Sequence, residues 1–277
     1  MVYQAMDTFL KALEEGNYVA PAMNTTNLEM TIAIVEAAEK TGCPVMVQIA
    51  PTNVKLSGYD YIAEIVKKAA ENVSVPVTLH LDHGMSFEDV KQAVDAGFAS
   101  VMIDASTLDY EENINLTKEV VEYCHQRGVL VEAELGELSG KEDDHVAEDA
   151  AQTDASLCKD FVERTGIDLL AVSIGNIHGI DQAPDLNFDL LQEINEKVNV
   201  PLVIHGGSGI PAEALAKLKD YGVRKVNLAS DLRKAFITAV GKRYEKNNNE
   251  YNLISVLFDA QKAVKEAAVP KFKALNG

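Results

Sequence analysis

The stretch PLVIHGGSG at residues 201–209 joins an apolar run to a histidine and then to a glycine-rich turn. Two other stretches share this arrangement, PVTLHLDHG at 76–84 and AVSIGNIHG at 171–179. Short apolar runs that end at glycine are typical of buried strands. The pattern therefore predicts three strands that each end near a His-Gly step, so that distant parts of the chain bring imidazoles to one place.

Strand-like runs of this kind alternate with stretches of helical periodicity along the whole chain, such as LEMTIAIVEAAEKTG. Several helical stretches end at a glycine, which is the usual left-handed stop. Eight strand-then-helix units and a final helix at about 256–273 predict an α/β fold, a (β/α)8 TIM barrel in which residues 1–277 form a single domain. A doubly wound open sheet is the alternative, although it normally uses fewer strands at this length. The predicted strands are 18–23, 44–49, 76–81, 100–103, 129–134, 169–173, 201–204 and 225–228.

Composition narrows the range of partners. The formal net charge is −18, which argues against nucleic acid or an anionic membrane, since both are bound by basic surfaces. An anionic small substrate would then need a metal, helix N-termini or a few placed cations. Cys43, Cys124 and Cys158 are too widely spaced for a CxxC motif or a disulfide framework. No signal-peptide pattern or membrane-length apolar run occurs, so we expect a soluble, cytoplasmic protein.

In a TIM barrel the active site lies at the carboxyl ends of the strands. His83 follows the third predicted strand, His178 the sixth and His205 the seventh. Three imidazoles at one rim can bind a divalent ion and leave a fourth position open, as in catalytic zinc sites. The other three histidines are expected to be structural or solvated: His80 inside a strand, His125 on a helix and His145 in a polar stretch.

Asp82 directly precedes His83. Neighbouring residues on a straight strand face opposite sides, so these two side chains converge only if the chain turns at Gly84. A carboxylate beside a metal that is not itself a ligand is a natural general acid or base. A helix cap or an ordinary loop aspartate is the alternative interpretation.

Glycine-rich turns near the predicted rim suggest a phosphate site. The backbone N–H groups of Gly206, Gly207 and Ser208 precede a helix that begins near Pro211, and Ser230 lies at the start of the last barrel helix. Phosphates bind at such turns and helix N-termini, and barrels often place them after strands 7 and 8. The polar segment 139–156 is expected to be a long loop at the barrel mouth.

Over about residues 6–258 the chain resembles the class II, zinc-dependent ketose-bisphosphate aldolases, which cleave fructose or tagatose 1,6-bisphosphate. The motifs that carry the resemblance occur in order along the chain: FLKALEEGNYVAPAMNTTNLE, LHLDHG, ASVMIDAS, ENINLTKEVV, VEAELGELSGKEDD, SIGNIHG, VIHGGSGIP and KVNLASDL. The resemblance implies a carbon–carbon lyase that releases dihydroxyacetone phosphate and glyceraldehyde 3-phosphate through a metal-stabilised enediolate. It also implies one Zn²⁺ per subunit, with room for a monovalent cation, and a homodimer or homotetramer.

The resemblance assigns roles to individual residues. It implies that His83, His178 and His205 bind zinc and that Glu134 is an alternative ligand. Asp82 would exchange the proton of the reacting hydroxyl, and Glu142 the proton on the carbon next to the carbonyl. The residues implied in substrate binding are Asn24, Gly179, Gly206, Gly207, Ser208, Asn227, Leu228, Ala229 and Ser230.

Departures from the family pattern leave the sugar open. Ala50 stands where members often carry serine, and HGIDQ after the sixth strand lacks the tyrosine and lysine of many fructose-type enzymes. Ala229 followed by Ser230 looks more like the tagatose type. Arg233 or Lys234 could reach a distal phosphate, with a solvated cation as the alternative. Two other functions therefore remain: the same chemistry on another phosphorylated ketose, deoxy or longer, and a non-catalytic sugar-phosphate-binding partner subunit. The class I route needs a Schiff-base lysine, and Lys225 is expected to be structural instead.

Overall fold

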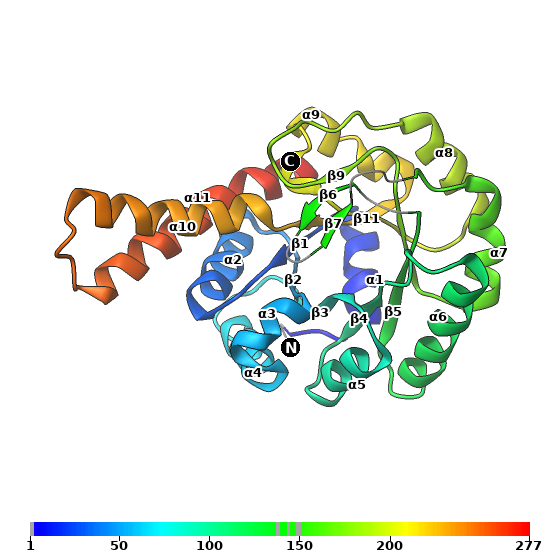
Figure 1. The fold of residues 1–277 in the computed structure, drawn as a ribbon, viewed down its shortest axis with the longest axis horizontal. Coiled ribbons are helices and arrows are strands. Elements are labelled where there is room, and N and C mark those ends of the chain that lie inside the picture. Colours follow the sequence, from blue (N-terminus) through cyan, green and yellow to red (C-terminus); the bar gives the residue numbers. More distant parts are fainter. Residues whose placement is uncertain (1–2, 137–138, 143–144, 148–150) are drawn as a thin grey trace.

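The computed structural model describes residues 3–136, 139–142, 145–147 and 151–277, and it describes side chains outside 137–150. Eight parallel strands close into a barrel in the order β1-β11-β10-β8-β5-β4-β3-β2, surrounded by helices (Figure 1). The predicted (β/α)8 barrel is confirmed. Its strands are β1 (Ala20–Asn24), β2 (Val45–Ile49), β3 (Val77–Gly84), β4 (Ser100–Ile103), β5 (Leu130–Leu135), β8 (Leu169–Val172), β10 (Leu202–Ile204) and β11 (Val223–Leu228).

The barrel strands are buried on both faces, because helices cover the outside and side chains fill the inside. This explains why they read as nearly continuous apolar runs. Most predicted boundaries differ from the observed ones by one or two residues. The exception is β3, which was predicted to end at 81 and continues through Asp82 and His83 to Gly84.

Polar side chains begin many of the helices. For example, Asn27 accepts a hydrogen bond from the Met30 N–H, and Ser86 accepts one from the Asp89 N–H. Gly42 and Gly166 end two helices in the left-handed conformation, as the sequence predicts. The helices are α1 (Met6–Gly16), α2 (Leu28–Thr41), α3 (Pro51–Ser57), α4 (Tyr59–Ala70), α5 (Phe87–Asp95), α6 (Tyr110–His125), α7 (Ala155–Thr165), α8 (Phe188–Lys197), α9 (Ala212–Leu215), α10 (Ser230–Lys246) and α11 (Leu253–Asn276).

Two helices outside the regular repeat shape the ends of the molecule. Helix α1 lies across one end of the barrel, where Met6, Phe9 and Leu13 join a buried cluster with Leu169 and Val203. Helices α10 and α11 form a long hairpin that extends away from the barrel (Figure 1). With α1 closing one end, the opposite end, at the carboxyl ends of the strands, is left for the site.

The segment 139–156 differs from its prediction as a loop. It contains β6 (Ser139–Glu142) and β7 (His145–Ala147), which pair antiparallel, and β6 also pairs with the short strand β9 (Ile177–His178). Such short strands form through backbone hydrogen bonds alone, so they carry little side-chain periodicity. The predicted loop therefore supplies two strands of a three-stranded sheet, whose third strand, β9, ends at His178.

Among the described residues, no helix combines the length and apolar character needed to cross a membrane. Cys43, Cys124 and Cys158 are free and buried at separate positions.

Candidate metal centre and active site

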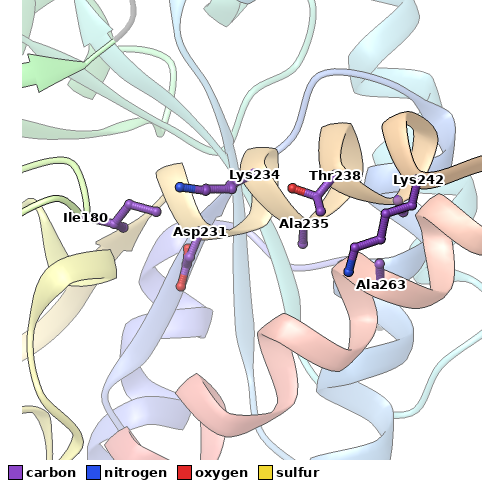
Figure 2. A pocket seen from close by; sticks show the side chains of 8 residues that line it. Ile180, Asp231, Lys234, Ala235, Thr238, Lys242 and Ala263 are labelled. Atoms are coloured by element: carbon purple, nitrogen blue, oxygen red, sulfur yellow. The ribbon is translucent and has the colours of Figure 1, made fainter. Parts of the chain in front are cut away.

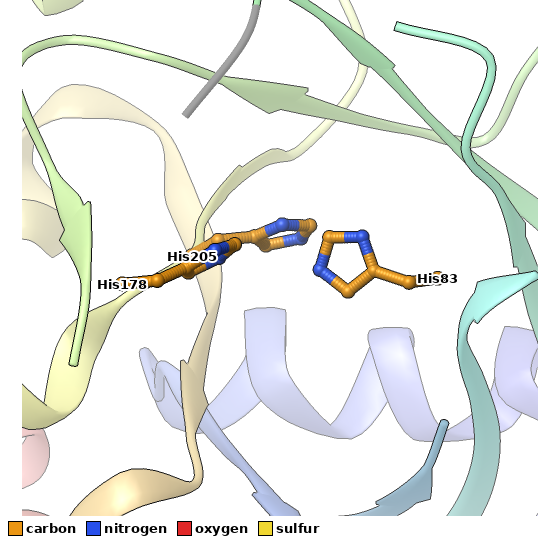
Figure 3. A group of neighbouring side chains, drawn as sticks. All are labelled: His83, His178 and His205. Atoms are coloured by element: carbon orange, nitrogen blue, oxygen red, sulfur yellow. The ribbon is translucent and has the colours of Figure 1, made fainter. Parts of the chain in front are cut away.

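Three histidines from separate parts of the chain meet at the carboxyl end of the barrel (Figure 3). His83 lies near the end of β3, His178 ends β9 and His205 follows β10. One ring nitrogen from each lies within 4.8 Å of the others. The His83 ring centroid is 4.7 Å from that of His205 and 5.7 Å from that of His178. The prediction that the three His-Gly steps converge is confirmed.

The turn that places His83 beside Asp82 lies at His83 itself, and not at Gly84 as predicted. His83 has a φ of 46°, and the pairing of β3 with β4 shifts register between Leu81 and Gly84. A left-handed non-glycine residue costs of order 1–3 kcal/mol and often occurs at functional sites. Gly84 is still required, because a Cβ there would lie 2.6 Å from the Met102 carbonyl oxygen.

A carboxylate fixes the ring of His83. Nδ1 lies 2.7 Å from Oδ2 of Asp104, and the Asp104 Oδ1 accepts hydrogen bonds from the backbone N–H and the hydroxyl of Ser106. Nε2 of His83 is buried and makes no hydrogen bond within the described part of the chain. This nitrogen is therefore available to a metal. Sequence reasoning missed Asp104, although its place directly after β4 was a usable signal.

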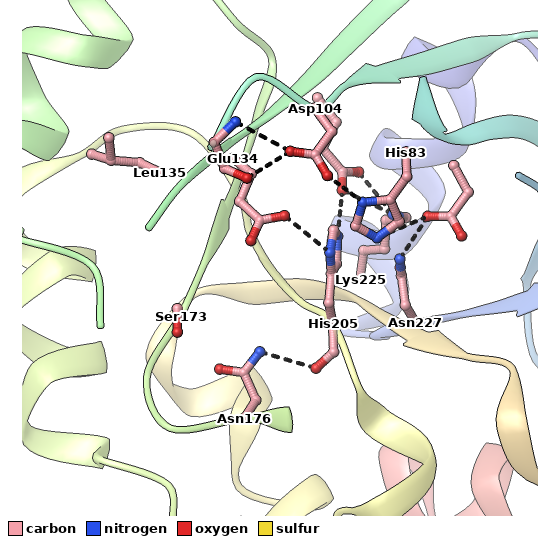
Figure 4. Close-up of polar contacts among 12 residues, drawn as sticks. His83, Asp104, Glu134, Leu135, Ser173, Asn176, His205, Lys225 and Asn227 are labelled. Carbon is pink, nitrogen blue, oxygen red and sulfur yellow. Dashed lines mark hydrogen bonds and ion pairs between the residues drawn. The ribbon is translucent and has the colours of Figure 1, made fainter. Parts of the chain in front are cut away.

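Two further carboxylates, those of Glu132 and Glu134, contact His205; Figure 4 shows Glu134 beside the His205 ring. Its Nε2 lies 2.9 Å from Oε1 of Glu132, and its Nδ1 lies 3.4 Å from Oε2 of Glu134. Lys225 pairs with both oxygens of Glu132, at 3.0 and 2.8 Å. Lys225 is thus structural, as predicted, whereas sequence reasoning did not identify Glu132.

A second set of candidate ligands adjoins the three histidines. Ligand atoms of His83, Asp104 and Glu134 also lie within 4.8 Å of one another. The proximity of Glu134 is consistent with its expected place as an alternative ligand. The two sets share His83, so a cation could occupy either position without leaving the site.

Asp82 is 1% exposed and is oriented by two amides. Asn24 donates to its Oδ2 at 2.7 Å, and Asn227 donates to its Oδ1 at 2.9 Å. Gln48, which sequence reasoning missed, in turn donates to Oδ1 of Asn24 at 2.8 Å. Asp82 caps no helix, since α5 is capped by Ser86. The structure therefore places Asn24 and Asn227 against Asp82, with their Nδ2 groups engaged by it.

The glycine-rich turn after β10 packs closely against its neighbours. A Cβ at Gly206 would lie 2.2 Å from the Ile177 oxygen, and one at Gly207 would lie 2.8 Å from the Asn227 oxygen. The Ser208 hydroxyl donates to Asp231 and accepts from the Ala229 N–H, so the turn is joined to the start of α10. These contacts bring the turn beside the first residue of α10, Ser230, with Leu228 buried at the end of β11.

Lys271 of α11 supports the same turn from behind. Its Nζ donates to the Ser208 carbonyl at 2.8 Å and lies 3.5 Å from Oδ2 of Asp231. Gly179 adjoins the same turn, since a Cβ at Gly209 would lie 3.1 Å from the Gly179 oxygen, and it has a φ of 104°. Glu142 ends β6, but its side chain lies outside what the structure describes.

The other described histidines, His80 and His125, lie outside the group of three, as predicted. His80 is fully buried and bonds to the Ser100 hydroxyl at 2.8 Å, and burial together with the Lys225 ammonium lowers its pKa to about 3. It is therefore a neutral structural residue. His125 is partly exposed and bonds to Asp168. The side chain of His145 is outside the described residues.

Comparison with known proteins agrees with this geometry. Residues 4–277 match the family model described as class II fructose-bisphosphate aldolase. The chain belongs to the class II fructose-bisphosphate aldolase family. It is 40% identical to the fructose-bisphosphate aldolase of Geobacillus stearothermophilus over 97% of this chain and 95% of that protein. A Staphylococcus aureus fructose-bisphosphate aldolase shares 40% identity over 97% of this chain and 96% of its own length.

Solved structures share the fold of this class II aldolase. The YdjI aldolase of Escherichia coli K12 superposes with a TM-score of 0.84 at 33% identity, covering 99% of this chain and 97% of that one. A putative fructose-1,6-bisphosphate aldolase from Coccidioides immitis gives 0.87 at 31% identity, covering 98% and 96%. The protein is therefore an aldolase, a carbon–carbon lyase with a TIM barrel.

The class II family is generally metal-dependent, and the residues of this aldolase fit a metal. Nε2 of His83 and Nδ1 of His205 are buried and make no hydrogen bond with the described residues, which is costly for an imidazole nitrogen unless another partner is present. Both rings are held through their other nitrogen by a carboxylate, as metal-binding histidines usually are. Nitrogen ligands with an open position favour a catalytic transition metal over Mg²⁺ or Ca²⁺.

Carboxylates also change the acidity of two of these imidazoles. Burial acts to lower the pKa of His205, but the hydrogen bond with Glu132 and the nearby carboxylate of Glu134 raise it to about 9. Burial likewise opposes a raised pKa at His83, yet Asp82 and Asp104 raise it well above its ordinary value. Without a metal, both rings would thus carry an extra proton at neutral pH.

Zinc uptake by the metal-free aldolase at about pH 7.5 is expected to release about one to two protons, because a metal displaces the proton of a charged imidazole. The raised pKa values of both rings give the sign: affinity falls as the pH drops, and for His205 the fall begins below about 9. Calorimetry in buffers of different ionisation enthalpy measures the number of protons. Uptake without proton release, with affinity constant between about pH 6 and 9, would contradict the assignment.

Proposed function

We propose that this aldolase reversibly cleaves a ketose 1,6-bisphosphate, fructose or tagatose 1,6-bisphosphate, to dihydroxyacetone phosphate and glyceraldehyde 3-phosphate. One Zn²⁺ per subunit would be held by His83, His178 and His205. The observation that carries the proposal is the meeting of three imidazole nitrogens within 4.8 Å beside the oriented carboxylate of Asp82. This constellation supplies an electrophile site and an acid/base group at one rim.

The reaction breaks the bond between C3 and C4 of the ketose. When bound, the metal acts as a Lewis acid that withdraws negative charge from the substrate oxygens. Asp82 takes the proton of the C4 hydroxyl, so that a C4 carbonyl forms as the C3–C4 electron pair stays on C3. Asn24 and Asn227 hold both oxygens of Asp82, which keeps the carboxylate in one orientation for this transfer.

The carbon left behind then needs a proton. We assign that transfer to Glu142, which in the cleavage direction delivers a proton to C3 and so completes dihydroxyacetone phosphate. Support comes from the backbone, because β6, which ends at Glu142, pairs with β9 through Gly140 and His178. This pairing places the segment that carries Glu142 beside one of the proposed metal ligands.

The phosphate of dihydroxyacetone phosphate is assigned to Gly179, to the turn at Gly206, Gly207 and Ser208, and to the residues around Ser230. Helix α10 begins there without a side-chain cap, so its first N–H groups remain for an anion. Lys271 holds the Ser208 carbonyl away from this position, which leaves the N–H side of the turn for the ligand. We also propose a monovalent cation near this phosphate, and we do not specify which cation it is.

Candidates for the distal phosphate lie on α10. Lys234 and Lys242 line a groove between α10 and α11 together with Asp231, Thr238 and Ala263, and Lys234 extends toward Ile180 at one end (Figure 2). Ile180 follows Gly179 in the segment assigned to substrate. Lys234 is therefore the residue of this groove that we place nearest to the sugar.

A retro-aldol assay with both bisphosphates, with and without a chelator, tests the proposed function. Chelator-sensitive cleavage of either sugar supports it. Cleavage restricted to other phosphorylated ketoses, deoxy or longer, would replace the substrate but keep the chemistry. Binding of sugar phosphates without cleavage by zinc-loaded protein would instead establish the non-catalytic partner subunit.

The residue at position 229 is expected to influence the sugar preference. The two bisphosphates differ in configuration at C4, and Ala229 cannot hydrogen-bond either epimer through its side chain. One such bond is worth about 0.5–1.5 kcal/mol, or roughly 2- to 13-fold. We therefore expect the wild type to cleave tagatose 1,6-bisphosphate at least as well as the fructose epimer. Ala229→Asp is expected to shift the kcat/KM ratio toward fructose by more than this factor, because a hydrogen bond to a charged group is worth about 1.5–3 kcal/mol.

Ala229→Ser is the matched control, since it adds a smaller hydrogen-bonding group without charge at the same buried position. Comparing the two variants separates a contact with the sugar from a change in the charge near the phosphate. A wild-type preference for fructose above about a hundredfold exceeds one hydrogen bond and would contradict the argument.

The proposal includes a homodimer or homotetramer that works in the cytoplasm. Large apolar side chains are exposed on the α10–α11 hairpin. Exposed apolar patches of this kind often form protein–protein interfaces, which supports an oligomer. The exposed side chains are Ile237, Tyr244, Tyr251, Leu253, Ile254 and Phe258. Analytical ultracentrifugation measures the assembly directly. Three buried free cysteines at separate positions support a reducing compartment.

A further inference from the structure

Glu132 lies at the centre of a buried polar network with His205, Lys225 and His80. Figure 4 labels His205 and Lys225 of this network. Glu132 projects from β5 and is fully buried. It contacts His205 at 2.9 Å, Lys225 at 2.8 and 3.0 Å, and His80 at 3.6 Å. No step proposed above for the reaction uses Glu132. Burying a charged side chain costs free energy unless partners compensate for the lost hydration, so the contacts of Glu132 need an explanation.

The contact between Glu132 and His205 determines which ring nitrogen of His205 carries the proton. An ionised carboxylate only accepts hydrogen bonds, so the ring nitrogen that faces Glu132 must carry the proton. That nitrogen is Nε2. Nδ1 makes only a longer contact, 3.4 Å to Glu134, so Nδ1 is the nitrogen that loses its proton and offers its lone pair when a metal binds. A ring rotated by 180° would place the Cδ2–H group at the metal position, and the other tautomer would place an N–H group there.

Lys225 explains why residue 132 is a carboxylate and not an amide. Its ammonium contacts both oxygens of Glu132 from β11, three strands away around the barrel, and Lys225 is itself 1% exposed. A neutral glutamine at position 132 has only one carbonyl oxygen to offer to two donors, Lys225 and His205. Its amide group would then face one of these donors without an acceptor.

We propose that Glu132, clamped by Lys225, is the positioning residue that fixes the ring orientation and tautomer of His205 for metal binding. This inference rests on the proposed function, because it requires His205 to be a metal ligand. Glu132 does not touch the substrate, and it acts through His205 alone. Partners of this kind typically change metal affinity by 10- to 100-fold.

The test compares Glu132→Gln with Ser100→Ala. Serine 100 bonds to His80 in the same buried network but does not contact His205, so the second variant is the matched structural control. Zinc affinity is measured by competition with a chelator, and the thermal stability of each metal-free protein is measured beside it. We expect Glu132→Gln to bind zinc about 10- to 100-fold more weakly than wild type, and Ser100→Ala to stay within about 2-fold despite lower stability.

Cobalt substitution gives a second measurement, one that a loss of protein stability alone does not change. The visible absorption of Co²⁺ in the site is expected to change in Glu132→Gln and to be retained in Ser100→Ala, because it reports the ligand geometry. Zinc affinity and a cobalt spectrum unchanged in Glu132→Gln would overturn the inference and leave the proposed function standing. Wild-type protein that binds no zinc would overturn both.

A measurement on the wild type covers the case in which Glu132→Gln does not fold. Long-range ¹⁵N–¹H spectra of histidine-labelled, zinc-loaded protein report which ring nitrogen of His205 carries the proton, with His205→Ala used for assignment. A proton on Nε2 and none on Nδ1 is the expected result. A proton on Nδ1 would overturn the inference.

Discussion

Chelation of the metal is expected to lower the rate of ketose-bisphosphate cleavage by more than about 10³-fold, and Zn²⁺ is expected to restore it. A Lewis acid contributes several kcal/mol to such a transition state, and each 1.4 kcal/mol is about tenfold in rate. Among the described side chains near Asp82, the cationic candidate inside the barrel is Lys225, and Glu132 already pairs with it.

One result would contradict this prediction. Full turnover by a dialysed, metal-free sample, with a covalent imine trapped by borohydride, would show class I chemistry instead. Lys225 would then be the first lysine to examine, since its Nζ is buried in the barrel.

Substitution of the proposed ligands provides the structural control for this prediction. His83→Ala, His178→Ala and His205→Ala are each expected to lose stoichiometric zinc while circular dichroism shows a retained fold. The barrel core lies below the rim, so these rings contribute more to function than to packing. Global unfolding of all three variants would identify the histidines as structural.

Much of this site was predictable because local sequence carries it. A strand followed by His-Gly is visible in PVTLHLDHG and PLVIHGGSG, and barrel topology requires all strand ends to meet at one rim. The eight strands and the glycines that end helices, such as Gly42 and Gly166, are local features of the same kind. No knowledge of long-range contacts was needed to place His83, His178 and His205 together.

The residues that were missed act across the barrel. Glu132, Asp104 and Gln48 look like ordinary strand or loop residues, and each gains its role from a partner at least 20 positions away: His205, His83 and Asn24 respectively. Sequence spacing cannot show which oxygen faces which nitrogen. The turn at His83 was missed for a related reason, because a positive φ at histidine has no signature when a glycine directly follows it.

The last prediction concerns Asp82, the group with the largest expected effect apart from the metal. Asp82→Ala is expected to retain zinc and to lose cleavage by on the order of 10²–10⁴-fold, as for loss of a general acid or base. Asp82 Oδ1 lies 3.9 Å from Nε2 of His83, so it is near the proposed metal position without belonging to either group of candidate ligands. Metal content and rate are measured on the same preparation.

Asp82→Asn separates the chemistry from the packing. The amide has the size of the carboxylate and keeps an oxygen for one of the two donors, Asn24 and Asn227, but it cannot take the C4 hydroxyl proton. We therefore expect Asp82→Asn to be nearly as slow as Asp82→Ala, although its substrate KM and zinc content stay closer to wild type. If Asp82→Asn instead recovered most of the wild-type rate, the hydrogen bonds between Asp82 and the two asparagines would be the reason the site needs this residue, and the proton would have to leave by another group at the rim.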